Sequence, residues 1–289
     1  MGIETTTEHL KEVLRTEVNQ FCRRNHRAWK QPIVDTLRDL RRMNVQAVLF
    51  GGTLRSLLVS RMFHGRPGRP RDVDIVVSGV PIGTLKQHFG KIIARETRFG
   101  GLHLQRGDWQ FDVWPLAQTW AFMRDAVAVP TFASLPSTTF FNLEAIAVDV
   151  WAPAGRSRTL YSADDQFFEG ILSRTIEVNR EENPFPDLCV VRALVLCAEI
   201  DFGVGPRLAG YIARHGKDLM APRLEELQRK HYGRCRIDGA TLRNWIKLIL
   251  DMHTAKVLQP IRLPLSQQLC LWPEPIETPH IRLHAIREM

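Results

Sequence analysis

The stretch AVLFGGTLRSLL, residues 47–58, decides which fold this sequence can adopt. A short apolar run ends at Gly51 and Gly52, and leucines at helical spacing follow it. This pattern predicts a buried strand, a tight turn and a helix. Glycine adopts backbone conformations barred to other residues and lets a bulky anion approach the main chain. Because free N–H groups at a helix start attract phosphate, the turn is a candidate phosphate site.

The two residues after the glycines can add to such a site. Thr53 offers a hydroxyl group, and the guanidinium of Arg55 can form paired hydrogen bonds with phosphate oxygens. We therefore predict that Gly51, Gly52, Thr53 and Arg55 bind a phosphate chain. A plain tight turn is the alternative interpretation of the glycine pair taken alone.

Two aspartates follow in DVDIVVSG, residues 72–79. Asp72 and Asp74 lie on one face of the predicted strand, where like charges about 4 Å apart would repel by about 4 kcal/mol at an effective dielectric of 20. Arg71 would offset part of this repulsion, and a divalent cation, which prefers carboxylate oxygens and substrate phosphates, fits it better. Asp112, on a further predicted strand, would complete a three-carboxylate cluster holding two Mg²⁺ or Mn²⁺ ions.

The remaining pattern predicts a mixed α/β head followed by a helical part. Helices are expected near 5–28, 31–43, 82–89, 188–200, 205–215, 219–231 and 239–256, and a hairpin is expected to turn at Gly107–Asp108. We predict four regions: N-terminal helices over 1–44 that pack on the head, a head domain over 45–160, a helical neck and body over 161–256, and a proline-rich C-terminal extension over 257–289.

The basic loop and the tryptophans each admit two interpretations. Gly and Pro make residues 64–71 a loop, and the arginines in and before it either gather phosphates or are solvated. These arginines are Arg61, Arg66, Arg69 and Arg71. Trp114, beside the third aspartate, either stacks a base or packs in the core.

Composition and charge narrow the classes of protein. The formal net charge of +8 favours polyanionic partners such as nucleic acid or nucleotide. The five cysteines contain no C-x-x-C pair, which argues against a disulfide framework or a structural metal.

No apolar run approaches about 18 residues and the N-terminus lacks a signal-peptide pattern, so we expect a cytoplasmic protein without a membrane partner. Neither a G-x-S-x-G elbow nor a Walker loop is present in the sequence.

Four stretches together resemble one family. FGGTLRSLLVSR (50–61) followed by RDVDIVV (71–77) resembles the head of class II CCA-adding enzymes and bacterial poly(A) polymerases, within the DNA polymerase β nucleotidyltransferase superfamily. FNLEAIAVDV (141–150), GILSRTIEVN (170–179) and VVRALVLCAEIDFGV (190–204) are similar to later segments of that family. The resemblance implies an α+β fold with a mixed-sheet head and an α-helical neck and body. It also implies metal-dependent, template-independent transfer of a nucleoside monophosphate from a triphosphate, with release of pyrophosphate.

The resemblance assigns roles position by position. Asp72, Asp74 and Asp112 match the catalytic metal ligands, and Asp112 would also accept the proton of the acceptor 3′-hydroxyl. The predicted nucleotide-binding residues are Gly51, Gly52, Thr53, Arg55, Arg71, Glu144, Asp187 and Arg192.

This chain departs from the family at several positions. Ser56, Ala117 and Glu144 stand where the family has aspartate, arginine and asparagine, and Glu144 either packs or reads the ribose. FPDLC (185–189) stands where the family has the base-reading EDxxR motif, so Asp187 would substitute for one base-reading acid. These departures argue against a housekeeping CCA enzyme and favour an accessory bacterial role, such as antiviral defence or a toxin acting on tRNA ends.

Three functions remain open from the sequence. The first is transfer of NMP or dNMP to a 3′-hydroxyl of a nucleic acid or short oligonucleotide. The second is transfer of NMP to a protein hydroxyl, and the third is a non-catalytic nucleic-acid-binding module. The base, the acceptor and the oligomeric state are left open.

Overall fold

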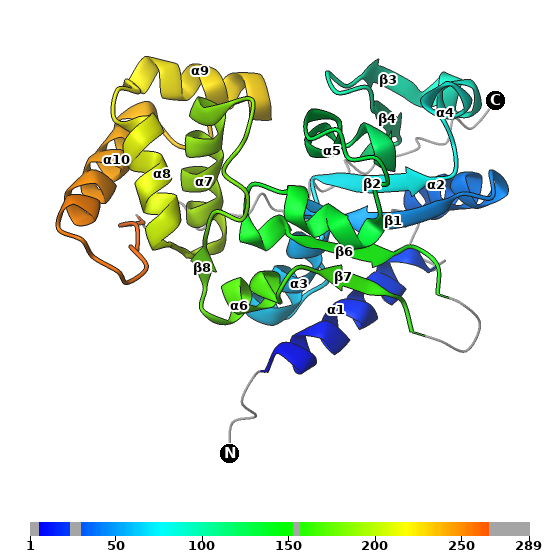
Figure 1. Cartoon of the computed structure of the whole chain (residues 1–289), viewed down its shortest axis with the longest axis horizontal. Helices are drawn as coiled ribbons and strands as arrows, with labels where there is room; N and C mark the ends of the chain where they lie inside the picture. Colours follow the sequence, from blue (N-terminus) through cyan, green and yellow to red (C-terminus); the bar gives the residue numbers. More distant parts are fainter. Residues whose placement is uncertain (1–5, 24–29, 153–156, 266–289) are drawn as a thin grey trace, which may run out of the picture.

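The computed structural model describes residues 6–23, 30–152 and 157–265. Within them, one mixed sheet has the strand order β3-β4-β5-β2-β1-β6-β7 (Figure 1). Its strands are β1 (Gln46–Phe50), β2 (Asp72–Ser78), β3 (Ile93–Glu96), β4 (Leu102–Arg106), β5 (Trp109–Pro115), β6 (Ile146–Asp149) and β7 (Leu160–Ser162). Only the β2–β5 pair in this sheet of the described chain is parallel.

Helices cover one face of this sheet. They are α1 (Thr7–Cys22), α2 (Gln31–Arg42), α3 (Gly52–His64) and α4 (Ile82–Phe89). Alternate residues of β2, namely Val73, Ile75 and Val77, are fully buried in the apolar cluster beneath these helices. Since successive strand residues point to opposite faces, Asp72 and Asp74 emerge on the other face.

A smaller apolar cluster lies on that second face. Val76 packs there with Phe122 of α5 (Trp120–Arg124) and with Leu135 of the 3₁₀ helix η4 (Phe132–Thr138). Leu116 of the 3₁₀ helix η3 (Leu116–Gln118) joins this cluster, whereas Ile92 of η2 (Gly90–Ile92) and Leu143 of η5 (Asn142–Glu144) pack with the larger one. The aspartates thus lie at the end of β2 that begins the strand, before the apolar cover at Val76.

The helical part follows β7 along the chain. It contains α6 (Gln166–Leu172), α7 (Pro186–Ile200), α8 (Pro206–Gly216), α9 (Ala221–Tyr232) and α10 (Gly239–Thr254), with the small parallel pair β8 (Thr175–Ile176) and β9 (Gly203–Val204). Figure 1 shows α7 to α10 gathered beside the sheet, at the left of the view. One apolar cluster continues from the sheet into these helices, from Leu10 to Ile249.

These elements confirm the predicted α+β class with a mixed sheet. The predicted hairpin is confirmed as well, because β4 and β5 are antiparallel and Gly107 at the turn has φ +57°. The first helix is shorter than predicted, since α1 ends at Cys22 and residues 24–29 lie outside the described ranges. The four-region division stays a prediction, and most of the proline-rich segment, residues 266–289, lies outside the described ranges.

None of the helices in the described ranges combines the length and apolar character needed to cross a bilayer.

Candidate active site

The glycine turn joins β1 to α3 in a conformation that requires glycine. Gly51 has φ +58° and ψ −123°, a region open to glycine and strained for other residues. A Cβ atom added to Gly52 would lie 3.4 Å from Arg55 Nη2 and 3.7 Å from Asp74 Oδ2. The turn therefore brings the start of α3, an arginine and an aspartate together around backbone with no side chain in the way.

Thr53 links this turn to β2. Its buried hydroxyl accepts a hydrogen bond from the backbone N–H of Asp74 at 2.8 Å and lies 3.3 Å from the carbonyl of Asp72. Because one hydroxyl hydrogen serves one acceptor at a time, the Thr53 side chain is engaged within the protein. The structure thus gives Thr53 a positioning role, and its predicted contact with phosphate stays a prediction.

The three predicted carboxylates share one face of the sheet. Asp74 of β2 is the direct register partner of Asp112 of β5, and Asp72 precedes Asp74 by two residues. Burial, and next the negative charges of Asp112, Asp72 and Glu144, raise the pKa of Asp74 well above its ordinary value. The fold therefore concentrates negative charge that the protein alone does not neutralise.

Two of these carboxylates already have partners. The guanidinium of Arg71 forms a fork with Asp72, with Nε 2.7 Å from Oδ1 and Nη2 2.6 Å from Oδ2. Asp112 Oδ1 lies 2.6 Å from Nδ1 of His103, which is on β4 directly opposite Asp112. Asp74 lies half-buried between them, with the hydroxyl of Thr53 at 3.5 Å from its Oδ2.

Glu144 links two arginines of different elements. Its Oε1 accepts from Arg55 Nη1 at 2.7 Å and from Arg192 Nη2 at 3.0 Å, so α3 and α7 meet at one carboxylate. The Glu144 side chain is 14% exposed. Burial raises its pKa, and the charges of Arg192 and Arg55 outweigh burial, so the pKa is lowered overall. Glu144 therefore places two cations beside the glycine turn.

The chemistry of this donor set fits a divalent cation at Asp74 and Asp112. Hard divalent ions prefer carboxylate oxygens, and here two carboxylates stand side by side with excess negative charge. Across residues 6–23, 30–152 and 157–265, no group of three His, Cys, Asp or Glu side chains already stands in metal-binding positions. Asp72 joins such a site only after it leaves the Arg71 fork.

Most of the arginines in and before the basic loop have partners inside the protein, and their binding of phosphate stays a prediction. A Cβ at Gly68 would lie 2.4 Å from the carbonyl of Ser56, so the loop packs directly on α3. Arg69 lies over the Trp109 ring at 5.2 Å, and Arg61 Nε donates to Glu17 at 2.6 Å. Arg66 is exposed.

Of the tryptophans near the third aspartate, Trp109 is buried and Trp114 is partly buried against the smaller apolar cluster. Trp109 is 2% exposed. Trp114 donates its indole N–H to Thr119 Oγ1 at 3.1 Å and packs edge-on against Phe50. Packing therefore accounts for both side chains.

Asp187 pairs with a residue outside the predicted site. Its Oδ2 lies 3.6 Å from Arg223 Nη2 of α9, and both side chains are exposed. Arg192, one turn and a half further along α7, reaches Glu144 instead. The assignment of Asp187 to base reading stays a prediction.

Three residues that the sequence analysis missed border the site. His103 contacts Asp112, and Tyr232 at the end of α9 has Arg71 at 5.5 Å and Arg236 at 4.4 Å from its ring centre. Burial, then Arg192 and Arg71, lower the pKa of the neighbouring His231 to about 4, which places this end of α9 beside the arginines. The sequence offers only one local signal, Gly233, which ends α9 directly after Tyr232.

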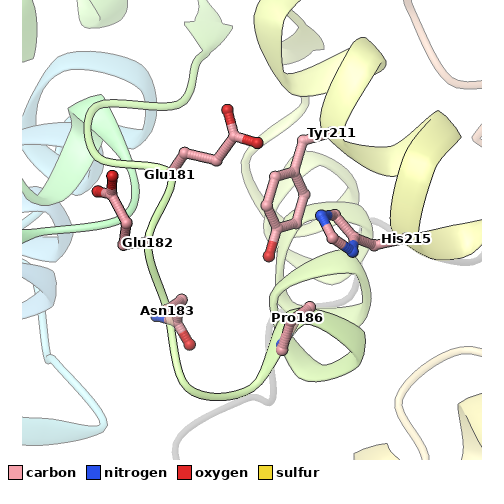
Figure 2. A pocket seen from close by; sticks show the side chains of 6 residues that line it. All are labelled: Glu181, Glu182, Asn183, Pro186, Tyr211 and His215. Atoms are coloured by element: carbon pink, nitrogen blue, oxygen red, sulfur yellow. The ribbon is translucent and has the colours of Figure 1, made fainter.

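A separate cavity of about 340 Å³ lies at the N-terminal end of α7 (Figure 2). It is lined by Glu181, Glu182, Asn183, Pro186, Tyr211 and His215. Figure 2 shows the loop residues facing the tyrosine and histidine of α8. None of the predicted site residues lines it.

Comparison with known proteins shows what this architecture is similar to. No protein-family model and no curated protein matches the sequence. Among solved structures, a Thermotoga maritima CCA-adding enzyme complexed with tRNA matches with a TM-score of 0.52 and 16% identity, over 77% of this chain and 52% of that one. A CCA-adding enzyme with ATP matches with a TM-score of 0.52 and 15% identity, over 77% and 52%.

A tRNA nucleotidyltransferase complexed with a primer tRNA and an ATP analogue matches with a TM-score of 0.50 and 19% identity, over 78% of this chain and 61% of that one. The chain thus spans between half and two thirds of the length of these structures. The mixed sheet and the following helices therefore share the fold of these solved CCA-adding enzymes and of the tRNA nucleotidyltransferase.

Proposed function

We propose that this chain is a metal-dependent, template-independent nucleotidyltransferase that transfers NMP or dNMP from a nucleoside triphosphate to a 3′-hydroxyl. The observation that carries the proposal is the pairing of Asp74 with Asp112 on neighbouring strands, beside a glycine turn lined by Arg55. Carboxylates next to a side-chain-free helix start suit a substrate that carries both a reacting hydroxyl and a triphosphate.

The triphosphate binds where the backbone is open and positive. The N–H of Gly51 donates to the carbonyl of Ile146, so the phosphate site is the start of α3 at Gly52 and Thr53, where the helix dipole favours negative charge. Arg55 and Arg192, held by Glu144, add two guanidinium groups from α3 and α7. These groups stabilise the charge that builds on the phosphates during transfer.

The transfer itself is a displacement at the α-phosphorus. The 3′-oxygen of the acceptor forms the new P–O bond, the bond to the bridging oxygen breaks, and pyrophosphate leaves with the electron pair. Asp112 takes the hydroxyl proton on its carboxylate. A divalent cation held by Asp74 and Asp112, with Asp72 once free of Arg71, would acidify the hydroxyl and neutralise phosphate charge.

The acceptor and the biological role belong to this proposal as well. The formal charge of +8 favours a nucleic-acid or oligonucleotide acceptor. The base-reading motif is replaced by FPDLC, and Asp187 pairs with Arg223. This combination supports a role other than tRNA maintenance, such as antiviral defence or toxicity directed at tRNA ends.

Transfer to a protein hydroxyl is the second candidate. The observation that favours it is the internal use of the loop arginines, because Arg61, Arg69 and Arg71 contact Glu17, Trp109 and Asp72 rather than forming an open basic track.

One assay tests the proposal. The purified protein is incubated with each labelled NTP and dNTP and with Mg²⁺ or Mn²⁺, with and without RNA and DNA primers. Extended primers or new oligonucleotides support 3′-hydroxyl transfer, and labelled protein supports the second candidate. Absence of product, together with absence of triphosphate binding in calorimetry, would contradict both and support a non-catalytic module.

Matched variants make the assay specific to the site. Asp74→Asn should remove product formation. Asp149→Asn changes an aspartate of the same sheet whose carboxylate contacts Tyr161, and it should leave product formation unchanged.

A further inference from the structure

A row of three polar side chains crosses the sheet beside the glycine turn. His103 of β4 is the register partner of Asp112 of β5, and Asp112 is the register partner of Asp74 of β2. Register partners share one face, so the three side chains emerge on the same side of the sheet. The row therefore runs from the imidazole of His103 to the carboxylate of Asp74.

The imidazole holds one specific oxygen of Asp112. Its Nδ1 lies 2.6 Å from Asp112 Oδ1, and because an ionised carboxylate only accepts, the Nδ1–H donates. The His103 side chain is 11% exposed and the Asp112 side chain 30% exposed. A buried ring thus holds a more exposed carboxylate, which fixes the carboxylate and leaves Oδ2 for the site.

Packing alone does not require a histidine here. The neighbours of His103 along β4, Leu102 and Leu104, are fully buried on the opposite face, which supplies the apolar anchoring of the strand. Gln105 follows His103 by two residues in β4 and lies on the same face. Its side chain is exposed and donates only to the carbonyl of Gly107. The apolar packing of β4 thus comes from its other face, and the polar contact of His103 is made with Asp112.

We propose that His103 is a positioning residue that orients the carboxylate of Asp112 for the acceptor hydroxyl. The inference rests on the proposed function, and it adds a residue on a strand outside the glycine turn and the aspartate pair. Hydrogen-bond partners behind a ligating or proton-accepting carboxylate commonly change metal affinity or activity about 10- to 100-fold when they are removed. This role requires the N–H donor and not the imidazole ring, so a side-chain amide that donates from the same position should orient Asp112 equally well.

Two substitutions separate the hydrogen bond from the volume of the ring. His103→Leu keeps apolar volume and removes the donor, and His103→Asn keeps an N–H donor near the position of Nδ1. We expect His103→Leu to lower kcat about 10- to 100-fold, with the KM for the triphosphate unchanged because Arg55 and the glycine turn are untouched. His103→Asn should retain most of the wild-type kcat. Gln105→Leu, on the same face of β4, is the matched control and should behave as wild type.

A second readout does not depend on turnover. Binding of Mn²⁺ alone, followed by electron paramagnetic resonance, should weaken about 10-fold in His103→Leu and stay near wild type in His103→Asn. Circular dichroism and thermal melts verify that each variant is folded.

The outcomes distinguish this inference from the proposed function. If wild type transfers nucleotide and His103→Leu matches it in both kcat and Mn²⁺ affinity, the inference is overturned and the proposed function stands. Equal losses in His103→Leu and His103→Asn would also overturn it, because the ring and not the donor would then matter. If wild type transfers no nucleotide to any acceptor, the proposed function fails, and the inference fails with it.

Discussion

Asp74 and Asp112 face each other across two neighbouring parallel strands, each on the face of the sheet away from α1 to α4. This arrangement of two half-buried carboxylates destabilises the fold when both are ionised, because desolvation and the charge of Asp112 disfavour the ionised form of Asp74. Proteins keep such unfavourable pairs mostly where function requires them. The relationship therefore predicts a conflict between stability and activity at this point of the sheet.

Asp74→Asn should stabilise the protein at pH 7 in the absence of divalent cations. An acid whose pKa is raised in the folded state weakens folding once the pH exceeds its unfolded value, and the amide removes that cost. Thermal unfolding in EDTA measures the effect, at about 2–4 °C for each kcal/mol gained. The gain should shrink when the melts are repeated near pH 3, where the wild-type carboxyl is protonated. An unchanged or lower Tm at pH 7 would contradict the assigned environment of Asp74.

Glu144→Gln should destabilise the protein, because it leaves Arg55 and Arg192 without their shared carboxylate. Breaking a buried ion pair costs about 3–5 kcal/mol, and we expect the lower end because Arg192 is partly exposed. Urea unfolding measures the difference. Glu226→Gln removes an exposed glutamate that also contacts two cations, and it should have little effect.

The same comparison has a predicted pH dependence. The pKa of Glu144 is lowered in the folded state, so its contribution to stability is present above pH 4.5, its ordinary value, and is lost as pH falls through the lowered value. The difference in unfolding free energy between wild type and Glu144→Gln should therefore be constant from pH 6 to 7 and narrow below pH 4. A difference independent of pH would show that Glu144 does not act through its charge.

Tyr232→Leu should weaken triphosphate binding through Arg71. The tyrosine ring lies against Arg71 and Arg236, and a cation–π contact contributes about 0.5–2 kcal/mol depending on burial. Without the ring, Arg71 loses its contact with α9, and only the fork with Asp72 orients its guanidinium. Calorimetry with a magnesium–triphosphate complex should show affinity reduced by several-fold. Tyr232→Phe keeps the ring and should bind as wild type, and an equal loss in both variants would assign the effect to the hydroxyl.

Gly51→Ala should destabilise the protein by about 1–3 kcal/mol, since φ +58° with ψ −123° is strained for any residue with a Cβ atom. The matched control is Gly83→Ala in α4, where an added Cβ meets nothing within 4 Å, and it should stabilise by about 0.5–1 kcal/mol. Chemical unfolding of both variants measures the contrast. Equal effects at the two positions would refute the strained turn.

The sequence by itself determined the local units of this protein. Gly51 and Gly52 after an apolar run specify a strand, a turn and a helix, because only glycine adopts that turn. The alternation in DVDIVVS places both aspartates on one face, because strand side chains alternate. Gly107 and Asp108 specify the hairpin for the same kind of local reason. Periodicity and backbone sterics act within a few residues, so they can be read without the fold.

Only the tertiary structure decided which of these units meet. The parallel register of β2 with β5 pairs Asp74 with Asp112, and the tertiary placement of α7 brings Arg192 to Glu144, which also accepts from Arg55 of α3. The sequence left the basic loop open between phosphate binding and solvation, and in the structure Gly68 packs on α3 and Arg69 lies over Trp109. Partners of charged and aromatic side chains are chosen by burial and by long-range strand register. A local sequence pattern contains no information on burial or on long-range strand register. The contacts of His103 and Tyr232 are therefore visible only in the folded chain.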